Sequence, residues 1–102
     1  MEELVREGLV RNIGFCNMNT NMIREVLCYA KIKPAVLQVE MHPYLTQKAL
    51  LRMARENGIQ VMAFSNLASA SYVEIGMSKA DESPCNLPAV TEIAARHSKT
   101  PA

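Results

Sequence analysis

The chain has 102 residues and a net charge of +1, from 11 basic and 10 acidic residues, and 49% of its residues are apolar by a broad count. This length fits one small domain, and the apolar fraction is that of a globular protein and excludes a disordered one. With no basic stripe and with three tyrosines, two phenylalanines and no tryptophan, binding to nucleic acid is poorly supported.

Targeting and redox features predict a cytoplasmic protein. Residues 1–8 carry charges where a signal peptide needs an apolar core, and no apolar run approaches the roughly 20 residues that cross a bilayer. We therefore expect no membrane partner. Cys16, Cys28 and Cys85 form no CxxC pair and lack histidines at zinc-site spacing. This pattern indicates reduced thiols and no metal.

The first part of the chain predicts a helix, a strand and a second helix. Residues 1–7 resemble the end of a helix, with Gly8 in the left-handed position that follows. A strand is predicted over about 11–16, and Asn19 or Thr20 can cap the next helix. The spacing of the apolar residues in that helix puts one stripe inward: Met22, Ile23, Val26, Leu27 and Ala30.

The middle of the chain repeats this order. Pro34 blocks helix continuation and precedes a strand over 36–40. Alternation gives that strand an apolar face, made of Ala35, Leu37 and Val39, and a face with polar residues at its end, made of Val36, Gln38 and Glu40.

A third helix and a third strand follow. We expect Thr46 to cap the helix, with Asn57-Gly58 ending it, before a strand over 59–64. The residues of this helix expected to face the sheet are Leu50, Leu51 and Ala54. The seven methionines of the chain are interpreted as fillers of gaps in the core.

The last part predicts a long loop and a helix. Residues 66–86 are rich in Ser, Ala and Asn and are expected to form a loop. A helix begins near 86–88, with proline tolerated in its first turn, and no strand follows it. We therefore expect residues 1–102 to form a partial domain that is truncated at both ends.

The three predicted strands begin about 25 residues apart, which is the length of one strand, one helix and two loops. Such a series predicts an α/β fold with a parallel sheet and right-handed crossovers. Ligands gather at the carboxyl ends of parallel strands. Asn17, Gln38 and Ser65 are near those ends and are candidate ligand-binding residues.

Three ordered sequence blocks cover the three predicted strand ends. They read Arg11-Asn12-Ile13-Gly14-Phe15-Cys16-Asn17-Met18, Gln38-Val39-Glu40-Met41-His42-Pro43-Tyr44 and Ala63-Phe64-Ser65-Asn66-Leu67-Ala68. Together these blocks resemble the aldo-keto reductase family. The chain departs from the usual family residues at four positions: Cys16 for serine, Met18 for an aromatic residue, Asn66 for proline and Ala68 for glycine.

The resemblance implies a fragment of a (β/α)₈ barrel, with about three parallel strands and flanking helices, from an enzyme that reduces small-molecule aldehydes or ketones with NADPH. Side-chain amides carry both a donor and an acceptor, which a nicotinamide carboxamide needs. The ring of Phe64 can stack on nicotinamide. By resemblance, the residues of this chain that contact NADP are Cys16, Asn17, Gln38, Phe64, Ser65, Leu67 and Ser69.

The resemblance also implies that this chain holds no catalytic residue. The tyrosine, lysine, aspartate and histidine of the family precede the matched blocks, so we expect the chain alone to be inactive. Among the polar residues here, His42 matches a structural turn, Glu40 is expected to line the barrel, and Tyr44 and Tyr72 lack the neighbours of the catalytic acid.

Two alternatives remain open. The chain could be a non-catalytic binding or regulatory module that docks on a full-length barrel relative, since an open sheet offers unpaired strand edges. It could also come from an unrelated (β/α) enzyme such as an isomerase, although the pairing of Asn17 with Gln38 argues against this.

Overall fold

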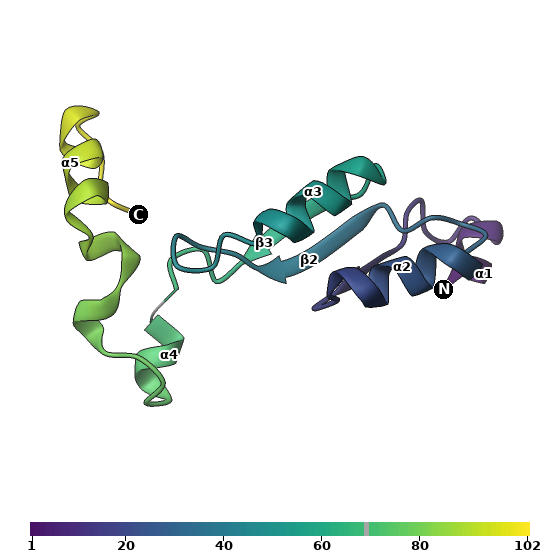
Figure 1. Cartoon of the computed structure of the whole chain (residues 1–102), viewed down its shortest axis with the longest axis horizontal. Coiled ribbons are helices and arrows are strands. Elements are labelled where there is room, and N and C mark those ends of the chain that lie inside the picture. The colour runs from purple at the N-terminus through teal and green to yellow at the C-terminus, as the bar shows by residue number, and fades with distance from the viewer. Residues whose placement is uncertain (69) are drawn as a thin grey trace. The chain divides into compact units, whose positions relative to one another are not determined.

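The computed structural model describes the backbone of residues 1–68 and 70–102, which form two compact units. The first unit comprises Met1–Glu40 and Gln47–Phe64, and the second comprises Met41–Thr46 and Ser65–Ala102. Figure 1 shows their helices and strands, coloured from the N-terminus to the C-terminus.

The first unit contains a parallel sheet of three strands. β1 (Gly14–Cys16), β2 (Val36–Glu40) and β3 (Gln60–Phe64) pair in the order β1-β2-β3. They are connected by α2 (Thr20–Tyr29) and α3 (Lys48–Glu56), which run beside the strands in Figure 1. The predicted parallel series of strands and helices is confirmed.

Both helices pack on the same face of β2. This face carries Leu37 and Val39, which are buried, whereas Gln38 between them is exposed. Burial of these apolar side chains is the main stabilising contribution to this unit. The buried cluster consists of Ile23, Leu37, Val39, Leu50, Met53, Ala54 and Ile59, with Phe15, Met18, Leu27 and Val61 packed against it.

A short N-terminal helix, α1 (Glu2–Arg6), is tied to the segment between α2 and β2. The Glu2 carboxylate accepts hydrogen bonds from the backbone N–H groups of Lys31, at 2.8 Å, and Ile32, at 3.0 Å. The bond from Ile32, followed by that from Lys31 and the charge of Arg6, lowers the pKa of Glu2.

The first strand is shorter than predicted, since it begins at Gly14 and not near residue 11. In the observed register Gly14 lies opposite Val36, so Asn12 would lie opposite Pro34. Proline has no backbone N–H to donate to a sheet. Pairing therefore starts at Ile13, whose carbonyl accepts from the N–H of Ala35 at 2.7 Å.

Of the N-caps predicted for α2 and α3, the first is confirmed and the second is wrong. Asn19 caps α2, with its side chain accepting from the N–H groups of Asn21 and Met22, both at 3.0 Å. The prediction of Thr46 as the cap of α3 is wrong. The N-cap is Gln47, which has a left-handed backbone with φ 49° and makes no side-chain cap bond.

The methionines do not mainly fill the core. Met53 is buried at 6% exposure, but Met22, Met62 and Met77 are 44%, 52% and 73% exposed. Met22 therefore falls outside the buried stripe predicted for α2.

The second unit has more helix than predicted. Residues 66–86 include α4 (Ala70–Glu74) and two 3₁₀ turns, η1 (Ala80–Glu82) and η2 (Pro84–Asn86), so the prediction of a plain loop is wrong. Local hydrogen bonds stabilise the 3₁₀ turns: the Glu82 carboxylate accepts from the N–H of Lys79 at 2.9 Å, and the Ser83 hydroxyl accepts from that of Cys85 at 3.3 Å. The predicted last helix is present as α5 (Pro88–Arg96).

Candidate cofactor site

Three side chains form a row across the exposed face of the sheet. The strand register puts Cys16 of β1 opposite Gln38 of β2, and Gln38 opposite Met62 of β3. All three are exposed, because each alternates with residues that face α2 and α3. The row therefore brings a thiol, an amide and a thioether together on one face of the sheet.

Asn17 adjoins this row at the end of β1. Its backbone N–H donates to the carbonyl of Gln38 at 2.9 Å, which extends the pairing one residue beyond the strand. Its φ of 54° lies in the left-handed region, which asparagine tolerates better than most residues. Two amide-bearing residues predicted from the sequence are thus neighbours, with Asn17 directly after β1 and Gln38 in the middle of β2.

Gln38 makes a side-chain contact that sequence reasoning missed. Its Nε2 donates to Sδ of Met62 at 3.1 Å. The sequence places Met62 on the same face of the strand predicted over 59–64 as Gln60 and Phe64. It does not identify Met62 as a partner of Gln38, which requires the register that places the two residues opposite each other.

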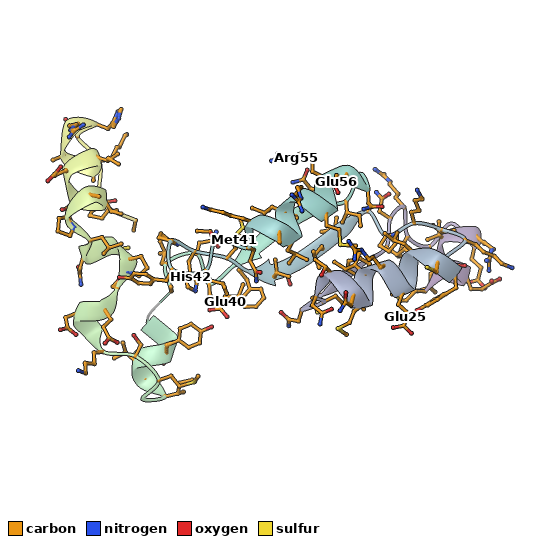
Figure 2. The ribbon with its side chains drawn as sticks, viewed as in Figure 1. Glu25, Glu40, Met41, His42, Arg55 and Glu56 are labelled. Atoms are coloured by element: carbon orange, nitrogen blue, oxygen red, sulfur yellow. The ribbon has the colours of Figure 1, made fainter. Side chains whose placement is uncertain are left out.

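Phe64 and Glu40 form the last pair at the carboxyl edge of this sheet. Both are half-buried. Phe64 follows Met62 on the same face of β3, so its aromatic ring belongs to the face that carries Gln38. Glu40 is labelled at the end of β2 in Figure 2. Its backbone carbonyl accepts a hydrogen bond from Nε2 of Gln47 at 3.2 Å.

The charged residues on the helices belong to a different surface. Figure 2 shows Glu25 on α2 and Arg55 and Glu56 on α3 pointing outward from the helices, and all three are exposed. The exposed row across the sheet carries no formally charged side chain. A neutral polar ring fits this row better than a phosphate does, since phosphate recognition relies on positive charge.

The remaining predicted residues follow β3 and lie in the second unit. Ser65 and Ala68 both have left-handed backbones, with φ of 52° and 45°, and the N–H of Ala68 donates to the carbonyl of Ser65 at 2.8 Å. Leu67, between them, is 54% exposed. Ser69 lies outside the described residues. Of the seven predicted residues, the structure thus places Cys16, Gln38 and Phe64 on the sheet, Asn17 directly after β1, and Ser65 and Leu67 in the segment of the chain that follows β3.

His42 lies in a tight turn of the second unit. His42 and Leu45 exchange backbone hydrogen bonds at 3.2 and 2.9 Å, and the His42 ring meets the Tyr44 ring edge-on at 6.3 Å. This position agrees with the turn that the sequence block predicted.

Within residues 1–68 and 70–102, no group of three or more His, Cys, Asp or Glu side chains is arranged to hold a metal ion. Across that same part of the chain, no helix combines the length and the apolar character of a membrane span.

The donor set on the sheet suits the nicotinamide end of a dinucleotide. A carboxamide needs both donors and acceptors, and the amides of Asn17 and Gln38 supply both. The chain also matches the model of the aldo/keto reductase family over residues 1–102. The chain belongs to the aldo/keto reductase family.

Individual members of this family resemble the chain over most of its length. It is 42% identical over 104 residues to the probable NAD(P)H-dependent D-xylose reductase of Emericella nidulans, a match that covers 100% of this chain and 33% of the relative. It is 49% identical over 75 residues to 4-dihydromethyl-trisporate dehydrogenase of Mucor mucedo, covering 74% of this chain and 23% of that protein.

A solved aldo/keto reductase has the same local fold. The aldose reductase of Schistosoma japonicum superposes with a TM-score of 0.77 and 38% identity, covering 99% of this chain and 29% of that structure. The predicted fold, three parallel strands with helices from a (β/α)₈ barrel, is therefore confirmed. The chain spans about a third of the length of the reductases that it matches, since 33% of the Emericella nidulans protein is covered.

Proposed function

We propose that this chain is a central-to-late segment of an NADPH-dependent reductase that converts aldehydes or ketones to alcohols. The adjoining amides of Asn17 and Gln38 carry this proposal, because their backbones are hydrogen-bonded at 2.9 Å and they offer a donor and acceptor set to one carboxamide. The relatives named as NAD(P)H-dependent D-xylose reductases support a small sugar aldehyde as the substrate class.

In the proposed site, Cys16, Asn17, Gln38 and Phe64 hold the nicotinamide end of NADPH. Asn17 and Gln38 orient the carboxamide, Cys16 offers a weak thiol donor, and Phe64 supplies a ring for stacking. By the family resemblance, Ser65 and Leu67, with Ser69 as a weaker candidate, are assigned to the pyrophosphate and nicotinamide side of the cofactor. When bound, a reduced nicotinamide supplies a hydride to a carbonyl carbon.

We propose that the chain by itself does not reduce carbonyls. By the family resemblance, the tyrosine, lysine, aspartate and histidine that protonate and orient the carbonyl precede the matched blocks, so no residue of this chain is assigned a catalytic role. The three free thiols support a cytoplasmic location, where cysteines stay reduced.

A chimeric barrel tests this function. In it, the whole chain replaces the matching 104-residue segment of the Emericella nidulans reductase. We expect the chimeric barrel to bind NADPH and to reduce D-xylose, and we expect the 102-residue chain alone to oxidise no NADPH with a small aldehyde. A folded chimeric barrel that does not bind NADPH would contradict the assignment of the cofactor site.

A second candidate function is a non-catalytic module that docks on a full-length barrel relative. The exposed sheet face favours it, because Met62 on that face is 52% exposed. Size-exclusion chromatography of the chain mixed with the purified full-length Emericella nidulans reductase tests this candidate. Co-elution at equal stoichiometry supports docking, and separate elution excludes it.

A further inference from the structure

The contact between Gln38 and Met62 fixes the direction of an amide in the proposed cofactor site. The two residues are register partners on β2 and β3, and Nε2 of Gln38 lies 3.1 Å from Sδ of Met62. Both side chains are on the exposed face of the sheet, opposite the buried Leu37 and Val39.

The chemistry of the two groups allows one orientation of the amide. The amide nitrogen of Gln38 carries two donor hydrogens and the amide oxygen only accepts, while a thioether sulfur accepts and cannot donate. When the amide nitrogen of Gln38 faces the sulfur of Met62, a donor meets an acceptor. A flipped amide would instead bring two acceptors together, which is repulsive.

We infer that Met62 is a positioning residue for Gln38. By holding the amide nitrogen, the Met62 sulfur leaves Oε1 of Gln38 available to accept a hydrogen bond from the N–H₂ of a nicotinamide carboxamide. The inference rests on the proposed function, which puts that carboxamide at Gln38. Met62 itself needs no contact with the cofactor in this account.

Leucine is the informative substitution at position 62. Met62→Leu keeps the volume and the apolar character of the side chain but removes the acceptor, and such swaps between leucine and methionine are well tolerated. Met22→Leu is the matched control, because Met22 is 44% exposed on α2 and its sulfur has no role in the inference.

The experiment compares two cofactors in the chimeric barrel by calorimetry. The first is NADPH, and the second is the reduced 3-acetylpyridine analogue, in which a methyl ketone replaces the carboxamide and removes the N–H₂ donor. We expect Met62→Leu to weaken NADPH binding by about threefold, as for the partial loss of one neutral hydrogen bond. Binding of the analogue should stay unchanged, so the preference for NADPH falls by the same factor, and Met22→Leu should alter neither value.

A second readout needs no cofactor. With ¹⁵N-labelled glutamine, the side-chain amide signal of Gln38, assigned through its loss in Gln38→Ala, should shift on Met62→Leu and not on Met22→Leu. An unshifted signal together with an unchanged preference for NADPH would overturn the role of Met62. If the unsubstituted chimeric barrel folds and does not bind NADPH, the proposed function itself fails, and the inference fails with it.

Discussion

The backbone N–H of Asn17 donates to the carbonyl of Gln38 over 2.9 Å, which ties the end of β1 to the middle of β2. This bond holds Asn17 in register beside Gln38, although Asn17 lies outside the strand. The backbones of the two residues are therefore neighbours because of main-chain pairing.

Substitutions at Asn17 separate its side chain from its backbone. Asn17→Gly keeps the left-handed conformation, with φ of 54°, and removes the amide. In the chimeric barrel we expect about tenfold weaker NADPH binding by calorimetry, as for the loss of a hydrogen-bonding group in the site, with little change in the free energy of unfolding. Asn17→Ala should weaken binding equally and also cost about 1 kcal/mol of stability. Unchanged binding in Asn17→Gly would count against a role for this amide.

Gly14 is required by the close approach of β1 to β2. A Cβ at this position would lie 2.5 Å from the carbonyl oxygen of Val36. We expect Gly14→Ala to lower the free energy of unfolding of the chimeric barrel by about 2 kcal/mol or more, measured with urea. Gly8→Ala is the control: an added Cβ there meets no atom within 4 Å, but the φ of +72° costs about 1 kcal/mol. Equal losses of unfolding free energy in the two variants would show that β1 and β2 can separate enough to accept a Cβ at position 14.

Ala68 is strained by its backbone conformation, since its φ is 45°. Glycine adopts this conformation without a steric penalty. We expect Ala68→Gly to raise the free energy of unfolding by up to about 1 kcal/mol. Ala94→Gly, at a buried position in the last turn of α5, should instead lower it by about 1 kcal/mol. A lower free energy of unfolding for Ala68→Gly in urea would mean that residue 68 does not have a left-handed backbone in solution.

Glu2 makes the attachment of α1 dependent on pH. Its pKa is lowered in the folded chain, chiefly by the hydrogen bond from Ile32, so the carboxylate stabilises the fold above the ordinary glutamate value of about 4.3. This contribution is lost as the pH falls through the lowered value. Relative to Glu2→Gln, the unsubstituted chimeric barrel should be more stable at pH 7, and the difference should shrink below about pH 4. Glu7→Gln serves as the control, and a difference that does not vary with pH would contradict the account.

The parts of the fold that depend on local sequence were predictable. Asn19 caps α2 because its short side chain reaches the N–H groups of Asn21 and Met22, and this geometry needs no tertiary contact. The alternation of Leu37 and Val39 with Gln38 likewise gave the correct faces of β2, because the period of a strand is fixed.

Two of the wrong predictions involve competition among caps or a contact with a distant residue. At the start of α3, Thr46 has the better capping side chain, but Gln47 takes the N-cap position with a left-handed backbone and donates to the carbonyl of Glu40 instead. The strand start near residue 11 was wrong because the pairing limit is set by Pro34, which is far along the chain.

The residues proposed for the cofactor site stay predictions, and the structure adds where the sheet places them. The sequence blocks selected Cys16, Gln38 and Phe64, and the strand register with its alternation puts these three on one face, while Asn17 directly follows β1. The role of Met62 needed the register, because a methionine has no sequence pattern that marks it as a partner of an amide.

The most direct test of the central claim is the affinity of Gln38→Ala in the chimeric barrel for NADPH and for 2′,5′-ADP, which carries the adenosine half of the cofactor and no nicotinamide. If Gln38 holds the nicotinamide end, the dissociation constant for NADPH should rise by about tenfold, while that for 2′,5′-ADP should not change. Equal affinities of the variant and the unsubstituted barrel for NADPH, or an equal loss for both ligands, would contradict the assignment.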